Sequence, residues 1–300
     1  MTNLPLATSP NYKLQTDRLS WGVVELQVTD LKRAANFWMS ALGLIKRNSA
    51  ATSISLGTNK KTLFVLHTGA SKAAEPAYTG MYHVAIGVRS QVEFSRLLAR
   101  LIQLKVRVSP TDHLLAKSLY LIDPDGLEIE IYFETPERFG HFGDVSRGLS
   151  MYDSEGRPHN GREPLNVHAE LAHTTSANVN ADIADDAYIA HIHFKVGNIE
   201  PALDWFETLG FSRHLTLTNW GFADMGAGVA NTHRLAMNIW AGQNLPAAPN
   251  DMARLIRYEL IGHDAGLLTN APLKRDGNIL RGCDPTGVDI SLRLADSKVD

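Results

Sequence analysis

Cysteine is nearly absent from this chain of 300 residues, in which Cys283 is the single one. A disulfide within the chain is therefore impossible, and a zinc site built from several thiolates is excluded. An excess of one charge is also lacking, because 29 Lys and Arg residues face 32 Asp and Glu residues. The net charge of −3 provides no general attraction to nucleic acid or to an anionic membrane surface.

Long apolar runs are missing as well. No stretch approaches the roughly 18 apolar residues of a membrane-spanning helix, and we expect no membrane partner. Residues 1–13 carry neither the basic start nor the apolar stretch of a signal peptide, so we expect a cytoplasmic protein. The proportions of hydrophobic residues (44%) and charged residues (20%) are those of a globular protein. Histidine is abundant, with 12 residues, and the positions of these histidines carry most of the functional information.

One local pattern occurs four times along the sequence. Residues 22–44 and 190–211 each contain a short alternating strand, a polar turn and an amphipathic helix that ends near a glycine. A third copy begins at residue 81, and a weaker fourth copy begins near residue 254, where Gly, Asn and Pro interrupt the expected helix. Such self-similarity predicts a chain built from repeated structural units.

Two of the copies also end alike. Residues 123–132 read DPDGLEIEIY and residues 284–293 read DPTGVDISLR, in which Asp-Pro-x-Gly predicts a turn and the alternation predicts a strand. We therefore predict an α+β fold of tandem modules, grouped as an N-terminal pair over 20–134 and a C-terminal pair over 188–294. The predicted modules are 20–68, 80–134, 188–242 and 253–294. Residues 135–187 lack periodicity and are rich in Gly, Asn, Asp, Ser and His, so we expect a linker that forms a surface loop or arm.

This combination of motifs resembles the vicinal oxygen chelate superfamily, which includes glyoxalase I, fosfomycin-resistance enzymes and type I extradiol dioxygenases. The segments LYLIDPDGLEIEIY, AHIHFKV and MNIWAGQNLP are similar in particular to two-domain catechol 2,3-dioxygenases. The resemblance implies βαβββ modules paired into two cupped, incomplete β-barrels with a metal inside. It also implies an Fe(II)-dependent extradiol dioxygenase that acts on a small aromatic diol with O2.

The resemblance further implies that metal ligands lie on the first and last strands of a module. When the modules are aligned, only the middle two offer such ligands, namely His83 and Glu130 in the second module and His191 in the third. The outer modules have residues such as Val23 and Ser291 at the matching positions. Two histidines and one carboxylate form the facial triad typical of non-haem Fe(II) with open positions. We therefore predict that the second and third modules share the functional cup, and that the first and fourth pair with each other.

Three catalytic candidates follow from the same resemblance. His233 lies in the last strand of the third module, where the family has its acid/base histidine. Tyr120 stands ten residues before Glu130, as a family tyrosine does, and His113 matches a second pocket histidine more loosely. Each has an ordinary alternative: a fourth ligand or simple packing for His233, a position at the sheet edge for Tyr120, and a loop position for His113.

The identity of one ligand, of the metal and of the reaction stays open in the sequence. His193 shares a strand face with His191 and would replace it as a ligand if the register were shifted by two residues. Mn, Zn or Ni in place of iron would suit a glyoxalase-like isomerase or lyase, and the fold also serves non-enzymatic binding proteins. Exposed sheet edges favour a homo-oligomer. Four linker histidines are expected in solvent: His141, His159, His168 and His173.

Overall fold

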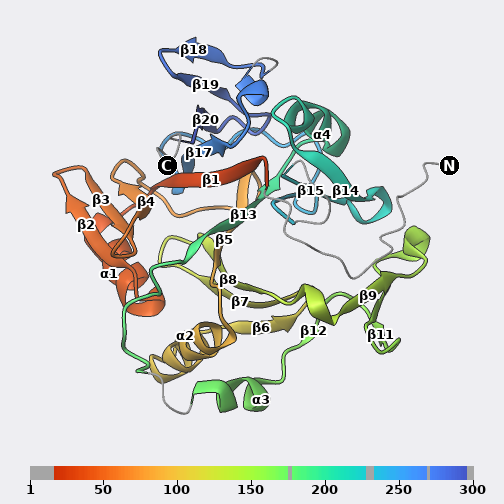
Figure 1. Ribbon diagram of the computed structural model, residues 1–300. Helices are drawn as coiled ribbons and strands as arrows, with labels where there is room; N and C mark the ends of the chain where they lie inside the picture. The colour runs from red at the N-terminus through yellow and green to blue at the C-terminus, as the bar shows by residue number, and fades with distance from the viewer. Residues whose placement is uncertain (1–16, 175–177, 228–232, 269–270, 296–300) are drawn as a thin grey trace.

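The computed structural model describes residues 17–174, 178–227, 233–268 and 271–295 (Figure 1), so segment 1–13 lies outside the described residues. The first module contains β1 (Leu19–Gln27), α1 (Leu31–Leu42), β2 (Ile45–Ser49), β3 (Ser53–Gly57) and β4 (Thr62–His67). The second contains β5 (Gly80–Gly87), α2 (Gln91–Gln103), β6 (Ser109–Asp112), β7 (Ala116–Ile122) and β8 (Glu128–Glu134). Both follow the predicted order of strand, helix and three strands.

The second half of the chain repeats this order. The third module contains β13 (Tyr188–Lys195), α4 (Ile199–Glu207), β14 (Ser212–Leu217), β15 (Phe222–Gly226) and β16 (Leu235–Asn238). The fourth contains β17 (Arg254–Gly262), β18 (Lys274–Asp276), β19 (Ile279–Cys283) and β20 (Asp289–Leu294). A short 3₁₀ turn, Ala265–Leu268, stands where its helix would be, because Gly and Pro residues interrupt the sequence there. These elements confirm the predicted α+β fold of four modules.

Capping side chains set the ends of the helices and turns. Asp30 accepts a hydrogen bond from the N–H of Arg33 at the start of α1, and Ser90 does the same for Glu93 in α2. Gly43 ends α1 with a φ of 73°, in the left-handed region that favours glycine. In the turn before β8, Asp123 Oδ1 accepts from the N–H groups of Asp125 and Leu127 at 2.9 and 2.8 Å. This turn fixes where β8 starts, and therefore which of its side chains face the site.

The strands form two large sheets, each shared by two modules. The second and third modules, together with β12 (Glu163–Pro164) from the linker, make a nine-stranded sheet in the order β12-β6-β7-β8-β5-β13-β16-β15-β14. The first and fourth make an eight-stranded sheet in the order β18-β19-β20-β17-β1-β4-β3-β2. The pairing of the two middle modules, expected from the distribution of ligands, agrees with this order. In each sheet the two central strands are the first strands of two modules, β5 with β13 and β1 with β17, paired antiparallel.

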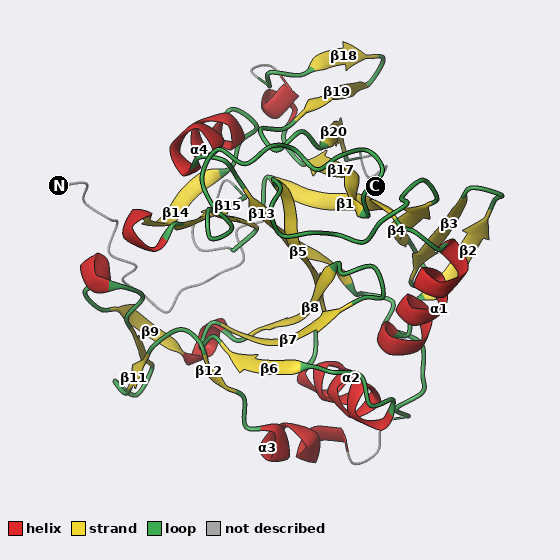
Figure 2. Cartoon of the chain, turned by 180° about the vertical axis from the view of Figure 1, so that it is seen from behind, coloured by secondary structure: helices red, strands yellow, loops and turns green. Residues whose placement is uncertain are grey.

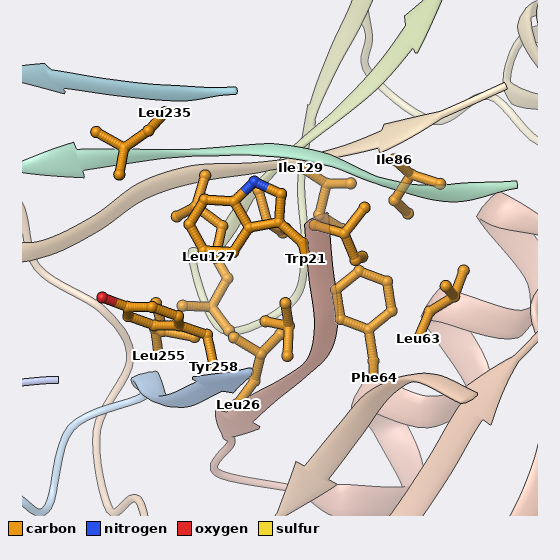
Figure 3. Close-up of a cluster of buried hydrophobic side chains, with 14 of the residues drawn as sticks. Trp21, Leu26, Leu63, Phe64, Ile86, Leu127, Ile129, Leu235, Leu255 and Tyr258 are labelled. Carbon is orange, nitrogen blue, oxygen red and sulfur yellow. The ribbon is translucent and has the colours of Figure 1, made fainter. Parts of the chain in front are cut away.

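Strands β1 and β13, which belong to different sheets, lie side by side (Figure 2), and the hydrophobic core lies between the two sheets (Figure 3). Trp21 and Tyr258 of the eight-stranded sheet pack edge to face, with ring centroids 5.3 Å apart, and Phe64 is fully buried beside them. Ile86 and Ile129 of the nine-stranded sheet close the core from the other side. Because side chains alternate along a strand, the neighbours of these core residues on β5 and β8 point to the opposite face. That face carries the polar residues of the site.

The segment 135–187, expected as a surface loop or arm, contains short elements of secondary structure. It contains a small sheet of β9 (Phe139–Phe142), β10 (Met151–Asp153) and β11 (Pro158–His159), then β12 (Glu163–Pro164) and α3 (Val167–Leu171). Strands of two to four residues are too short to produce a readable periodicity. The side chain of His159 is 9% exposed near Asp112, against the expectation of a solvent position, whereas His141, His168 and His173 are exposed.

A buried carboxylate anchors this arm to the nine-stranded sheet. Glu170 on α3 accepts hydrogen bonds from Ser95 at 2.6 Å and from Gln91 at 3.1 Å, and it forms an ion pair with Lys117 of β7 at 2.7 Å. A buried carboxylate with three donors is well compensated for its loss of hydration. The arm therefore has a fixed position along one side of the sheet. Among the described helices, none is both long and apolar enough to cross a membrane.

The core between the sheets gives the first testable prediction. Replacing Phe64 by Ala removes a fully buried ring and should lower the free energy of unfolding by about 3–5 kcal/mol. Val92 on α2 is 51% exposed, so Val92→Ala should change the stability by about 0.5 kcal/mol or less. Urea unfolding followed by tryptophan fluorescence measures both values. Equal effects of the two substitutions would contradict the packing described here.

Candidate metal centre

Three polar side chains converge on the face of the nine-stranded sheet that points away from the core. On the antiparallel strands β5 and β13, His191 lies opposite Ala85 while His83 lies opposite His193. On the other side of β5, Glu130 of β8 also lies opposite Ala85. His191 and Glu130 thus flank the same small side chain, and His83 stands two residues along the strand. The methyl group of Ala85 leaves room for the three longer side chains to meet above it.

The meeting atoms have the spacing of metal ligands. His83 Nε2 and His191 Nε2 are 3.2 Å apart, and Glu130 Oε2 lies 3.0 and 2.9 Å from them. Nitrogen and oxygen ligands bind transition metals at about 2.0–2.2 Å, and two such bonds at a right angle put the ligand atoms about 3 Å apart. Within the described part of the chain these three residues are the one group with metal-ligand geometry.

The three side chains are buried, and a bound metal would compensate the polar atoms that have lost contact with water. Their side chains are 5%, 1% and 2% exposed for His83, His191 and Glu130. Glu130 Oε2 accepts no hydrogen bond of acceptable geometry from any described residue, although both imidazoles are near. A buried carboxylate oxygen without a donor is costly unless a cation compensates it. The donor set of two imidazoles and one carboxylate therefore fits a divalent transition metal such as iron.

The imidazole of His191 is in the protonation state that metal binding requires. Burial lowers the pKa of His191 to about 3, even though Glu130 acts in the opposite direction. The ring is thus neutral at physiological pH and can offer the Nε2 lone pair. Its orientation is held by packing, because the ring of Tyr132 stands edge-on to it at 5.0 Å. Nδ1 of His191 has no hydrogen-bond partner among the described residues.

His193, the alternative ligand, is occupied by another contact. Its Nε2 lies 2.8 Å from Asn238 Nδ2, while Asn238 Oδ1 accepts from the N–H of Trp240. The amide therefore donates to His193, and the lone pair that a metal would need is already used. Burial also lowers the pKa of His193 well below its usual range. In this arrangement His191, and not His193, belongs to the convergent group.

Tyr120 and His113 lie on one side of this group. Tyr120 and Glu130, which are ten residues apart in the sequence, lie directly opposite each other in the β7–β8 pair. His113 Nδ1 donates to the carbonyl of Gly161 at 2.6 Å, so its Nε2 accepts the hydrogen bond from the Tyr120 hydroxyl at 3.0 Å. Burial and nearby Glu130 raise the pKa of Tyr120 well above its ordinary value, and the phenol stays protonated.

His233 lies beside His191, with one correction to its predicted position. It precedes β16 by two residues instead of lying within that strand. Its ring contacts that of His191, with centroids 4.5 Å apart and planes at 79°. His233 Nδ1 donates to Asp224 Oδ2 at 2.8 Å, and Asp224 is 4% exposed. His233 is therefore next to the convergent group without being part of it.

Aromatic side chains form a wall beside His83. Tyr82 packs against His193 and Trp240 with centroid distances of 4.9 and 5.5 Å. Trp240 is nearly parallel to Phe222 at 6.1 Å, and it is 51% exposed. Flat apolar surfaces of this kind suit a planar aromatic ligand. We refer to Tyr82, Phe222 and Trp240 as the aromatic wall.

Sequence reasoning missed several residues around the site. Asp224 was not a candidate, and neither was Arg162, whose guanidinium carbon lies 5.5 Å from the Tyr120 ring centroid. Arg162 and Gly161 come from the arm, whose path no sequence pattern indicates. The FADMG segment of β15 shows a single carboxylate on an otherwise small or apolar strand. The isolated Asp224 in this strand was the one sequence feature that could have indicated a functional carboxylate here.

The other sheet has no comparable cluster on its matching face. His67, at the end of β4, pairs with Glu25 at 2.8 Å, and Arg257 lies 3.5 Å from the same carboxylate. His67 was overlooked because it follows the segment compared with the ligand strands. These groups compensate one another as partly exposed ion pairs, and no metal-ligand group occurs there among the described residues.

Comparisons with known proteins agree with this architecture. Residues 21–131 match the family model "Glyoxalase/Bleomycin resistance protein/Dioxygenase superfamily". The chain is 26% identical over 245 residues to a catechol-2,3-dioxygenase of Bacillus subtilis (strain 168), covering 80% of this chain and 81% of that protein. Glyoxalase I from Zea mays has a similar structure, with a TM-score of 0.52, 14% identity and 92% of each chain covered. The cppA protein from Streptococcus pneumoniae TIGR4 matches with a TM-score of 0.50, 11% identity, and 93% and 97% coverage. The predicted resemblance to this superfamily is thereby confirmed, with the family model matching residues 21–131, and the structural likenesses support the fold alone.

The geometry predicts which substitutions abolish metal binding. His83→Ala, His191→Ala and Glu130→Ala should each reduce the bound metal from one ion per chain to near zero, because each removes one of three converging donors. Anaerobic loading followed by elemental analysis measures the content.

His67→Ala is the matched control, since it removes a strand histidine and its carboxylate contact from the other sheet. It should retain the metal. Full occupancy in the His83→Ala protein would contradict the assignment, and so would loss of metal in the control.

Proposed function

We propose that this member of the glyoxalase/dioxygenase superfamily is an Fe(II)-dependent extradiol dioxygenase, which cleaves the ring of a catechol-type aromatic diol with O2. His83, His191 and Glu130 would hold the iron. The observation that carries the proposal is the buried convergence of two imidazoles and one carboxylate within 3.2 Å of one another. The similarity to a catechol-2,3-dioxygenase over most of the chain supports the same reaction class.

Two groups of side chains beside the candidate ligands would bind the substrate and move its protons. When bound, Fe(II) supplies open positions for the two hydroxyl oxygens of the diol and for O2, and the electron density that activates O2. His233 donates its Nδ1–H to Asp224, so Nε2 is the nitrogen that carries the lone pair. A neutral imidazole in this state accepts a proton from a substrate hydroxyl and returns it later.

Tyr120 supplies a hydroxyl with a fixed direction from β7. His113 accepts its proton in a hydrogen bond, which turns the lone pairs of the phenolic oxygen away from His113. Those lone pairs can accept a hydrogen bond from a substrate hydroxyl. His113 therefore acts on the substrate through Tyr120, and the aromatic wall offers a surface for the ring of the diol.

One observation bears on the glyoxalase-like alternative, an isomerase or lyase that uses Zn, Ni or Mn. Such sites usually contain more carboxylate than one residue, and Glu130 is the single carboxylate of the convergent group within the described chain. His233 is not part of the convergent group, so the described geometry offers three ligands and not four. Both features favour the dioxygenase, and non-enzymatic binding would leave the flanking proton-transfer groups without a role.

Oxygen uptake tests this proposal. Protein loaded anaerobically with Fe(II) should consume O2 when a catechol is added and form a yellow ring-opened product, with one O2 used per diol. The panel should include catechol, substituted catechols and fused-ring diols. Protein loaded with Zn(II) and the Glu130→Ala variant should do neither. Turnover of a thiol-conjugated substrate by the Zn(II) or Ni(II) protein, without O2 uptake by the Fe(II) protein, would favour the alternative.

The flanking residues give a separate prediction about kcat. His233→Ala should keep its iron and lose about 10²–10⁴ in kcat, which is the usual contribution of a positioned acid or base. Tyr120→Phe removes one hydroxyl and little volume, and should show a smaller loss. Steady-state kinetics with parallel iron analysis measure both. A His233→Ala protein without metal would make His233 a ligand, and one with full activity would leave it a packing role.

A further inference from the structure

The orientation of His233 depends on one contact. The residue lies just outside β16, and its side chain is 29% exposed, so strand pairing does not fix its ring. Phe222 lies parallel to the ring at 6.5 Å and His191 stands edge-on at 4.5 Å. Such contacts limit the tilt of the ring but do not distinguish Nδ1 from Nε2. The hydrogen bond to Asp224 does distinguish them.

Asp224 is held on both of its carboxylate oxygens. Oδ2 accepts from His233 Nδ1 at 2.8 Å. Oδ1 accepts from the backbone N–H of Leu215 at 2.7 Å and from His214 Nδ1 at 3.1 Å. The backbone of Asp224 lies in the middle of β15, paired with Ala236 of β16. A buried carboxylate with three donors, two from β14 and one from the loop before β16, is a rigid acceptor.

We infer that Asp224 is the positioning residue of His233: it fixes the ring so that Nδ1 carries the proton and Nε2 faces the metal centre as an acceptor. The expected effect on kcat rests on the proposed function, whereas the position of the proton on the His233 ring does not. A carboxylate accepts hydrogen bonds and cannot donate them while ionised, so it selects one tautomer of a neutral imidazole.

The matching position in the other sheet supports this assignment. Strands β3 and β15 occupy the same place in their modules. When their terminal glycines, Gly57 and Gly226, are aligned, Ser55 of β3 is the residue that corresponds to Asp224 of β15. In that sheet no metal-ligand group is present among the described residues, and the position holds no carboxylate. The buried carboxylate therefore occurs in the sheet that carries the candidate ligands.

Asp224→Asn is the sharpest variant, because it keeps the shape and removes the charge. The amide has one acceptor oxygen, which the Leu215 N–H requires. Its NH2 group then faces His233 and donates to Nδ1, which forces the ring proton onto Nε2. The acceptor that the substrate needs is thereby lost. We expect kcat to fall by about 10²-fold or more, with KM changed by less than about threefold and iron content unchanged.

Two measurements test this inference independently. Nitrogen-15 NMR of histidine-labelled, Zn(II)-loaded protein should show His233 protonated on Nδ1, and on Nε2 in the Asp224→Asn variant, with the signal assigned by His233→Gln. In kinetics of the Fe(II) protein, the double variant Asp224→Asn/His233→Ala should be no slower than His233→Ala alone, since residues that act as a unit are not additive.

A buried carboxylate of the other sheet provides the control. Asp284 accepts the hydroxyl hydrogen bond of Tyr258 at 3.0 Å, and Asp284→Asn should leave kcat and the His233 signal unchanged. An unchanged His233 tautomer in Asp224→Asn, or fully additive losses in the double variant, would overturn the positioning role. If the wild-type protein shows no ring cleavage with any diol, the proposed function fails, and the NMR result alone then decides the inference.

Discussion

The antiparallel pairing of β5 with β13 is the constraint on which the site depends. It sets His191 opposite Ala85 and His83 two residues along, while the parallel pairing of β5 with β8 brings Glu130 to the same alanine. A slip of one residue in either pairing would turn these side chains into the core. The apolar neighbours of the candidate ligands, such as Ile86 and Ile129, resist such a slip because they are buried between the sheets. The packing of the core therefore also defines the metal-ligand geometry.

The two sheets show how one architecture serves two roles. Both have the first strands of two modules at their centre, and both present a polar face away from the core. In the nine-stranded sheet that face is buried and carries histidines with few alternative partners. In the eight-stranded sheet it carries ion pairs such as Glu25 with His67 and Glu259 with Arg293, which satisfy one another. The candidate site thus depends on the side chains of one face, and not on the fold that both sheets share.

Much of the architecture was predictable from local patterns. Strand alternation, the caps Asp30 and Ser90, and the Asp-Pro-x-Gly turns each encode their structure within a few residues, so the modules could be outlined from the sequence. The convergence of His83, His191 and Glu130 was expected because the resemblance specified strand positions. Asp224 and Arg162 could not be found in this way. Their roles depend on which strand lies next to which, and on the path of an arm whose strands are too short to show a period.

A metal ion bound at one place on the nine-stranded sheet is the central claim of this account. An anomalous difference map at the iron edge, from crystals grown and loaded with Fe(II) without oxygen, tests it most directly. The account predicts one peak per chain, about 2.0–2.2 Å from His83 Nε2, His191 Nε2 and a Glu130 oxygen. A peak beside Glu25 and His67, or no peak in protein that retains iron by elemental analysis, would contradict it.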